Sequence, residues 1–154
     1  MANSIRHQIM DAVLTALEGI TKANGYETNV KLVSEQLEDH EQVPKSDFPA
    51  LFPIDADESR EVVEMPDTSS LDIEAELKVI VTGMVFDRTN KTRQQRTDLL
   101  RDVEKAMIND SSLSALILYI EPGEVLTDHG SIPNFSIWDQ SYQVTYRYSS
   151  VLGG

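Results

Sequence analysis

The spacing of apolar and polar residues predicts two amphipathic helices in this chain of 154 residues. Apolar side chains recur every three to four positions through residues 4–25 and again in the second half of residues 88–110, as on the buried face of a helix. Thr89 or Asn90 is the expected cap of the second helix. The expected buried stripe of that helix is Leu99, Leu100, Val103, Ala106 and Met107. Its first two turns lack large apolar residues, so we expect them to be solvated or to contact a polar surface.

Residues 71–87 have the strongest strand pattern. Alternation places eight residues on one face: Leu71, Ile73, Ala75, Leu77, Val79, Val81, Gly83 and Val85. A strand of about 15 residues greatly exceeds the usual 5–6. We therefore expect it to extend beyond its sheet as half of a hairpin arm with residues 59–66, through a turn at residues 67–70.

Three other segments are predicted to be strands. They are a short strand at residues 28–35, a buried strand at residues 115–121 and an alternating strand at residues 135–149. Residues 122–134 are expected to be a loop, and residues 149–154 a flexible tail.

The segment "FPALFPI" at residues 48–54 predicts a rigid apolar corner. Pro49 and Pro53 cannot donate to a strand ladder, so the segment is expected at a sheet edge. These elements together predict a single α+β domain over residues 1–154. We expect a mostly antiparallel or mixed sheet with two amphipathic helices packed on one face and an extended β-hairpin arm.

The net charge of −13 is concentrated in one part of the sequence. Fourteen acidic and two basic residues lie between Ser34 and Glu76, whereas Asp87 to Lys105 contains six basic and four acidic residues. The acidic segment is expected to be a solvated loop, or to face a partner, a neighbouring copy or a channel. A basic helix half could pair with the acidic arm of an adjacent copy, and such heterologous contacts close into rings. An acidic chain is poorly suited to gripping nucleic-acid phosphates.

Candidate chemistry is sparse. The chain has no cysteine and 3 histidines. His40 lies between Glu38 and Glu41, but this spacing matches no standard metal-ligand pattern. Asp128 and His129 are expected to form a turn, since nothing places a nucleophile beside them. Without a glycine-rich phosphate loop, we expect no catalytic, cofactor or metal site, and no enzyme. We also see no signal peptide or apolar run long enough to span a membrane, which predicts a soluble protein made in the cytoplasm.

The chain resembles the tail-terminator proteins of long-tailed bacteriophages. The segments that carry this resemblance are "IRHQIMDAVLTAL", "NGYETNV", "FPALFPI", "ELKVIVTGMV", "RTDLLRDVEKAMIND" and "VTYRY", in that order. The resemblance implies a sheet with helices on one side, and a ring, typically of six subunits, that caps the tail tube and joins it to the neck. The implied partners are the tail-tube protein, a neck or connector protein and DNA as a passing cargo, at the tail–neck junction of the virion, after assembly in the host cytoplasm.

The charge pattern and the resemblance together select the candidate residues. Those expected at a subunit interface or a lumen are Glu58, Glu61, Glu64, Asp72, Glu74, Glu76, Arg88, Lys91, Arg93 and Arg96. Those expected to wedge the sheet edge are Phe48, Leu51 and Phe52. Two alternatives remain open: a neck or head–tail joining protein, and an acidic domain that mimics DNA.

Overall fold

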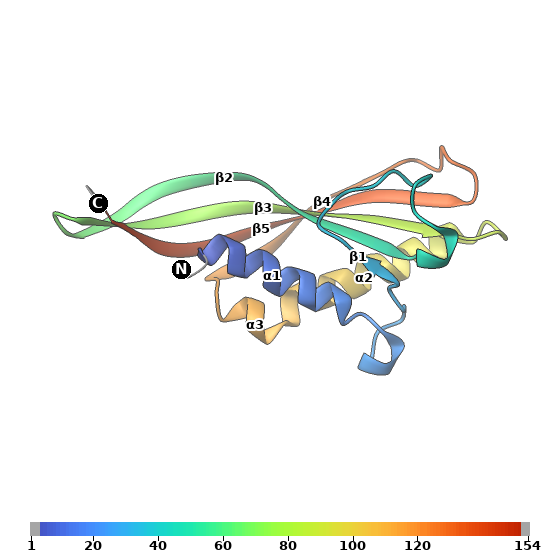
Figure 1. The fold of residues 1–154 in the computed structure, drawn as a ribbon, viewed down its shortest axis with the longest axis horizontal. Coiled ribbons are helices and arrows are strands. Elements are labelled where there is room, and N and C mark those ends of the chain that lie inside the picture. Colours follow the sequence, from blue (N-terminus) through green and yellow to red (C-terminus); the bar gives the residue numbers. More distant parts are fainter. Residues whose placement is uncertain (1–3, 152–154) are drawn as a thin grey trace.

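A five-stranded mixed sheet with helices on one face forms the molecule, as Figure 1 shows for the computed structural model, which describes residues 4–151. The elements in chain order are α1 (Ile5–Glu18), a 3-10 helix (Lys22–Asn24), β1 (Leu32–Val33), a second 3-10 helix (Lys45–Asp47), β2 (Ala50–Asp67), β3 (Ser70–Phe86), α2 (Thr92–Asn109), α3 (Ser111–Ser114), β4 (Tyr119–Thr127) and β5 (Phe135–Val151). The strand order is β1-β2-β3-β5-β4, with β1 parallel to β2 and the other neighbours antiparallel. The predicted α+β class and helix placement are confirmed.

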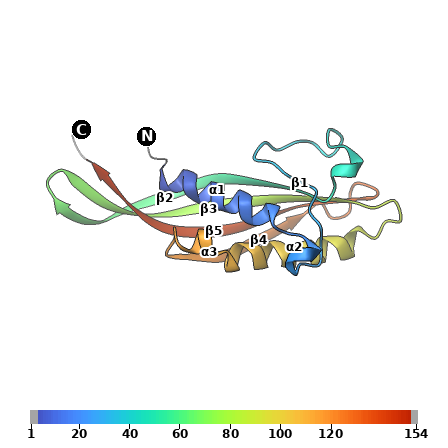
Figure 2. The same ribbon diagram turned by 60° about the horizontal axis from the view of Figure 1, so that its bottom comes forward.

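The core lies between the helices and one face of the sheet. Alternation along β3 directs Leu77, Val79 and Val81 into this core, where they are completely buried, as predicted. The predicted stripe of α2 packs against the same core, with Leu99 and Val103 fully buried and Leu100 partly buried. Figure 2 shows α1 and α2 side by side along the sheet. We call the opposite face of the sheet the outer face.

The predicted arm is present, but it has three strands instead of two. β2 and β3 form the expected hairpin, with its turn at Thr68 and Ser69. β5 pairs with β3 over the full length of both strands, from Ser70↔Val151 to Phe86↔Phe135. We use "arm" for residues 59–67, 70–76 and 145–151. Residues 149–151, expected to be flexible, therefore belong to β5, and residues 152–154 of the expected tail lie outside the described residues.

Residues 115–127 differ from their prediction. Residues 115–121 were expected to form a buried strand, but β4 begins only at Tyr119 and its side chains are mostly exposed. β4 is an edge strand, and it continues to Thr127, through the first six residues of the segment 122–134 that was expected to be a loop; residues 128–134 form the loop. A register shift between Pro122 and Val125 absorbs the proline and glycine that predicted a turn.

Two helix ends also differ from the prediction. α1 ends at Glu18, and a 3-10 turn then leads to Gly25, whose φ of 91° is left-handed. At the start of α2 neither Thr89 nor Asn90 is the cap. Instead, the Asp87 carboxylate accepts the backbone N–H groups of Thr89 and Lys91 at 3.0 and 3.2 Å. Those hydrogen bonds lower the pKa of Asp87, and the largest contribution comes from the backbone N–H of Thr89.

The one tryptophan of the chain packs over a glycine in the middle of the sheet. Trp138 on β5 lies directly opposite Gly83 on β3, and a Cβ atom added to Gly83 would overlap the indole ring. Because Trp138 is only 1% exposed, the ring has little space into which it could move. Gly83 therefore provides the room that the largest core side chain requires.

We expect Gly83→Ala to lower the free energy of unfolding by about 1–3 kcal/mol through overpacking. Urea denaturation monitored by Trp138 fluorescence would measure it. The double variant Gly83→Ala/Trp138→Phe should lose less than the sum of the two single variants, because the smaller ring relieves the overlap. Wild-type stability in Gly83→Ala would contradict this packing.

Candidate functional site

The arm carries most of the predicted acidic site residues, and Figure 1 shows it projecting beyond the start of α1. Three of these residues alternate along β3 on the outer face and contact the neighbouring strand β5. Asp72 accepts a hydrogen bond from Ser149 Oγ at 2.6 Å, Glu74 pairs with Arg147 at 3.1 Å, and Glu76 accepts from Gln143 Nε2 at 2.7 Å. These three carboxylates are therefore already engaged within the chain.

The free edge of β2 presents the remaining acidic residues of the arm. β1 pairs only with Ala50 and Leu51, so in the described part of the chain no strand lies beside β2 from Ile54 onward on the side away from β3. Glu61 and Glu64 are exposed along this edge. These two side chains are the predicted acidic residues most accessible to a partner.

Glu58 has a different environment, at the base of the arm. Its side chain is only 3% exposed, and it accepts hydrogen bonds from the Tyr146 hydroxyl at 2.5 Å and from Arg60 Nε at 2.6 Å. Arg6 of α1 approaches the same carboxylate at 3.7 Å. Glu58 is thus a buried, compensated charge that joins α1 to the sheet, and it is not a surface group.

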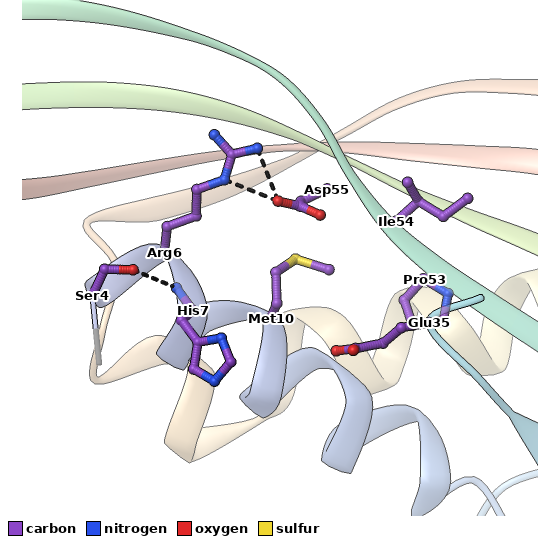
Figure 3. Close-up of a pocket in the computed structure, with 8 residues that line it drawn as sticks. All are labelled: Ser4, Arg6, His7, Met10, Glu35, Pro53, Ile54 and Asp55. Atoms are coloured by element: carbon purple, nitrogen blue, oxygen red, sulfur yellow. Dashed lines mark hydrogen bonds and ion pairs between the residues drawn. The ribbon is translucent and has the colours of Figure 1, made fainter. Parts of the chain in front are cut away.

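Arg6 clamps the arm at an irregularity in β2. The register of β2 shifts between Asp55 and Glu58, so the backbone there is not held by a regular ladder. Arg6 Nη2 bonds the Ala56 carbonyl at 3.1 Å and the Asp55 carboxylate at 2.8 Å. Figure 3 shows Arg6 and Asp55 beside an open pocket of about 420 Å³ between α1 and β2. The sequence contains no motif for this clamp, because its members are about 50 positions apart.

We expect Arg6→Met to destabilise the fold by about 1–3 kcal/mol, because it removes one cationic partner of the buried Glu58 carboxylate and the hydrogen bond to the Ala56 carbonyl. Hydrogen exchange should rise selectively around residues 55–60. Arg101→Met is the matched control: Arg101 reaches Glu27 at 3.7 Å with both side chains more than half exposed, and such pairs contribute about 0–1 kcal/mol. Equal losses in the two variants would show that Arg6 does not act as a clamp.

Two buried tyrosines of β5 lie in the core near this base. Burial raises the pKa of the Tyr142 phenol, and the nearby Glu104 carboxylate raises it further. Burial likewise raises the pKa of Tyr146, with its hydrogen bond to Glu58 as the second cause. The Tyr142 hydroxyl accepts a hydrogen bond from Gln140 Nε2 at 2.6 Å. Both phenols are therefore held in their protonated form.

These shifts predict a loss of stability in alkali. The folded protein holds the two phenol protons more tightly than the unfolded chain does. Their contribution is therefore complete below the ordinary tyrosine pKa of about 10 and falls as the pH rises above it. Urea midpoints between about pH 8 and about pH 11 should decrease, and less steeply in Tyr142→Phe than in a control at the exposed Tyr119. Identical slopes in the two variants would refute this assignment.

The predicted basic residues lie at the opposite end of the molecule from the arm. Figure 1 shows the loop before α2 and the start of α2 at the far end from the β2–β3 turn. Arg88, Lys91 and Arg93 are exposed, whereas Arg96 is half-buried and donates to Ser136 Oγ at 3.0 Å. The acidic and basic sets therefore do not meet within one chain.

The "FPALFPI" corner contributes to the core and not to a surface. Leu51 packs beneath the helices, while Phe48 and Phe52 pack on the outer face against Val43 and Met84, under the loop that precedes β2. All three predicted corner residues are at most 8% exposed. Pro53 lies beyond the two residues that β1 covers, so the predicted edge position holds for that proline.

The histidines have local partners. His7 pairs with Asp11 at 3.2 Å and His40 with Asp39 at 2.8 Å, and His129 occupies a turn with a φ of 58°. Within residues 4–151, no group of three or more His, Cys, Asp or Glu side chains is arranged to hold a metal ion. None of the helices in this part of the chain is long and apolar enough to cross a membrane.

Comparison with protein-family models and with curated protein sequences finds no match to the chain.

Proposed function

We propose that this chain is a non-enzymatic structural protein of a long-tailed bacteriophage, a tail terminator that forms a ring on the tail tube and joins it to the neck. The observation that carries the proposal is the separation of charge. A projecting acidic arm and an exposed basic helix end lie at opposite ends of an elongated molecule. Two different, complementary surfaces on one chain favour heterologous contacts, which close into a ring when the rotation permits.

The fold also agrees with the resemblance. The resemblance implies a sheet with helices on one side, and α1 and α2 cover one face of this sheet. On this proposal the partners are further copies of the chain, with six in a ring as the resemblance implies, together with the tail-tube protein and a neck protein. DNA passes through the ring, which forms in the host cytoplasm and resides at the tail–neck junction.

Two alternative roles compete with this proposal. A neck or head–tail joining protein would use the same surfaces and differ only in its position in the particle. An acidic mimic of DNA would need a row of open carboxylates. In this arm Asp72, Glu74 and Glu76 instead bond to groups of β5. This internal pairing favours an assembly protein over a mimic.

We expect the purified protein to form closed rings, or rings to be present at the tail–neck junction of native particles. Light scattering and particle images would measure this. A protein that is monomeric in solution and in the particle would refute the proposal.

The response of the ring to salt would locate the arm. If exposed carboxylates contact a neighbour, the variant Glu61→Gln/Glu64→Gln and added salt should each weaken the ring, because screening acts within about 10 Å at 0.1 M. If they line a lumen, both changes should leave the ring intact or strengthen it by relieving like-charge repulsion. Glu18→Gln/Glu124→Gln, at exposed sites outside the arm, is the control.

A further inference from the structure

The outward face of α2 is cationic along its length, well beyond the basic residues at its start. Arg93, Arg101 and Lys105 are exposed on this helix, and Glu104 is its one exposed carboxylate. Arg101 also lies 3.7 Å from the exposed Glu27, and Lys105 donates to the Gly25 carbonyl at 3.2 Å. Ile108, near the end of the helix, is 43% exposed. The helix therefore presents a basic stretch followed by one exposed apolar side chain.

The free edge of β2, from Asp57 at the base of the arm towards the turn, has the converse character. Asp57, Glu61 and Glu64 are exposed there. Val62 and Met65, which are 52% and 61% exposed, are interleaved with these carboxylates. The turn end of β2 and β3 extends beyond the helices that cover the rest of the sheet (Figure 2). A projecting ribbon with exposed apolar side chains is suited to lie against another protein surface.

The two surfaces match in length and in charge. From Asp57 to Met65 a strand spans about 26 Å at a rise of about 3.3 Å per residue. From Arg93 to Ile108 a helix spans about 22 Å at 1.5 Å per residue. Placed side by side in the same direction, the carboxylates of the edge meet the basic residues of the helix, and Met65 lies at the same end as Ile108. Exposed ion pairs contribute only about 0–1 kcal/mol each, so contacts of Val62, Met65 and Ile108 would supply much of the stability.

Within one chain these surfaces cannot meet. α2 packs on β3 and β5 at the end of the sheet away from the arm, and the arm extends in the other direction (Figure 1). We propose that the arm edge of one copy lies lengthwise along α2 of the next copy. This proposal rests on the self-assembly that the proposed function requires, and it adds which surfaces form the contact and how they are aligned.

Charge exchange tests the alignment. Variant A (Glu61→Lys/Glu64→Lys) and variant B (Arg93→Glu/Arg101→Glu) should each weaken self-association by roughly tenfold or more at about 0.1 M salt. The chain that carries all four changes has a basic arm and an acidic helix, so it should associate as the wild type does. An equimolar mixture of A and B should also associate. Failure of the four-change chain to recover, while it melts at the temperature of the wild type, would overturn the contact.

Cross-linking provides an independent test, because the chain has no cysteine of its own. Under mild oxidation Met65→Cys/Ile108→Cys should give a ladder of covalent oligomers, since each copy would join one neighbour by its arm and another by its helix. Met65→Cys/Leu126→Cys is the control, because Leu126 is 60% exposed on β4 and outside the proposed contact. A ladder only with Ile108 supports the contact; no ladder, or equal ladders, overturns it.

The same experiments separate this contact from the proposed function. Rings that form without any Met65–Ile108 cross-link overturn the arm–helix contact and leave the ring in place. A ladder from a protein that is absent from the tail–neck junction of particles supports the contact and overturns the terminator role.

Discussion

The continuous pairing of β3 with β5 is the constraint on which the other features depend. Both strands are 17 residues long and pair from end to end. One half of this ribbon forms the floor of the core beneath α1 and α2, and the other half projects as the arm. The same ladder therefore positions the buried aromatic side chains of the core and the polar pairs of the arm. The arm cannot shift its register without moving Trp138 away from Gly83.

The distribution of charged residues follows the same division of the sheet into a half covered by helices and a half that projects as the arm. Where the sheet is covered, its residues are apolar on the helix side. Where it projects, carboxylates on β3 bond to groups of β5 across the outer face. The transition lies at Glu58, whose buried carboxylate is compensated by two arginines and a tyrosine. An uncompensated carboxylate at that position would carry a large desolvation cost. The junction of body and arm thus combines charge pairing at Glu58 with apolar packing of Leu77, Val144 and Tyr146.

Local pattern was enough to predict the elements that are buried on one face. The strict alternation of residues 71–85 and the helical spacing of α1 and α2 led directly to the central strand and the covering helices. Residues 115–121 were misassigned because apolar residues there have different roles. Leu116 and Ile117 pack against the core from the segment before β4, whereas Leu118 and Tyr119 are exposed. Composition alone does not distinguish an apolar connection from a buried strand.

The candidate site was predictable only as two charged regions. Which acids remain open depends on strand register, since Ser149 and Gln143 lie 77 and 67 positions from their carboxylate partners. The Arg6 clamp was missed for the same reason. The exposed edge of β2 also depends on how short β1 is, and no feature of residues 28–35 indicates that only Leu32 and Val33 would pair.

The position of β5 in the chain has a consequence for synthesis and folding. During synthesis β3 can pair with β2 as soon as both have been made. The other edge of β3 has no partner until β5 has left the ribosome. The pairs of β3 with β5 are therefore among the most distant in sequence, and distant pairings form late. Until then neither the core floor nor the arm is complete. A chain without β5 would thus lack the three-stranded arm, which restricts assembly through the arm to copies in which β5 has been made.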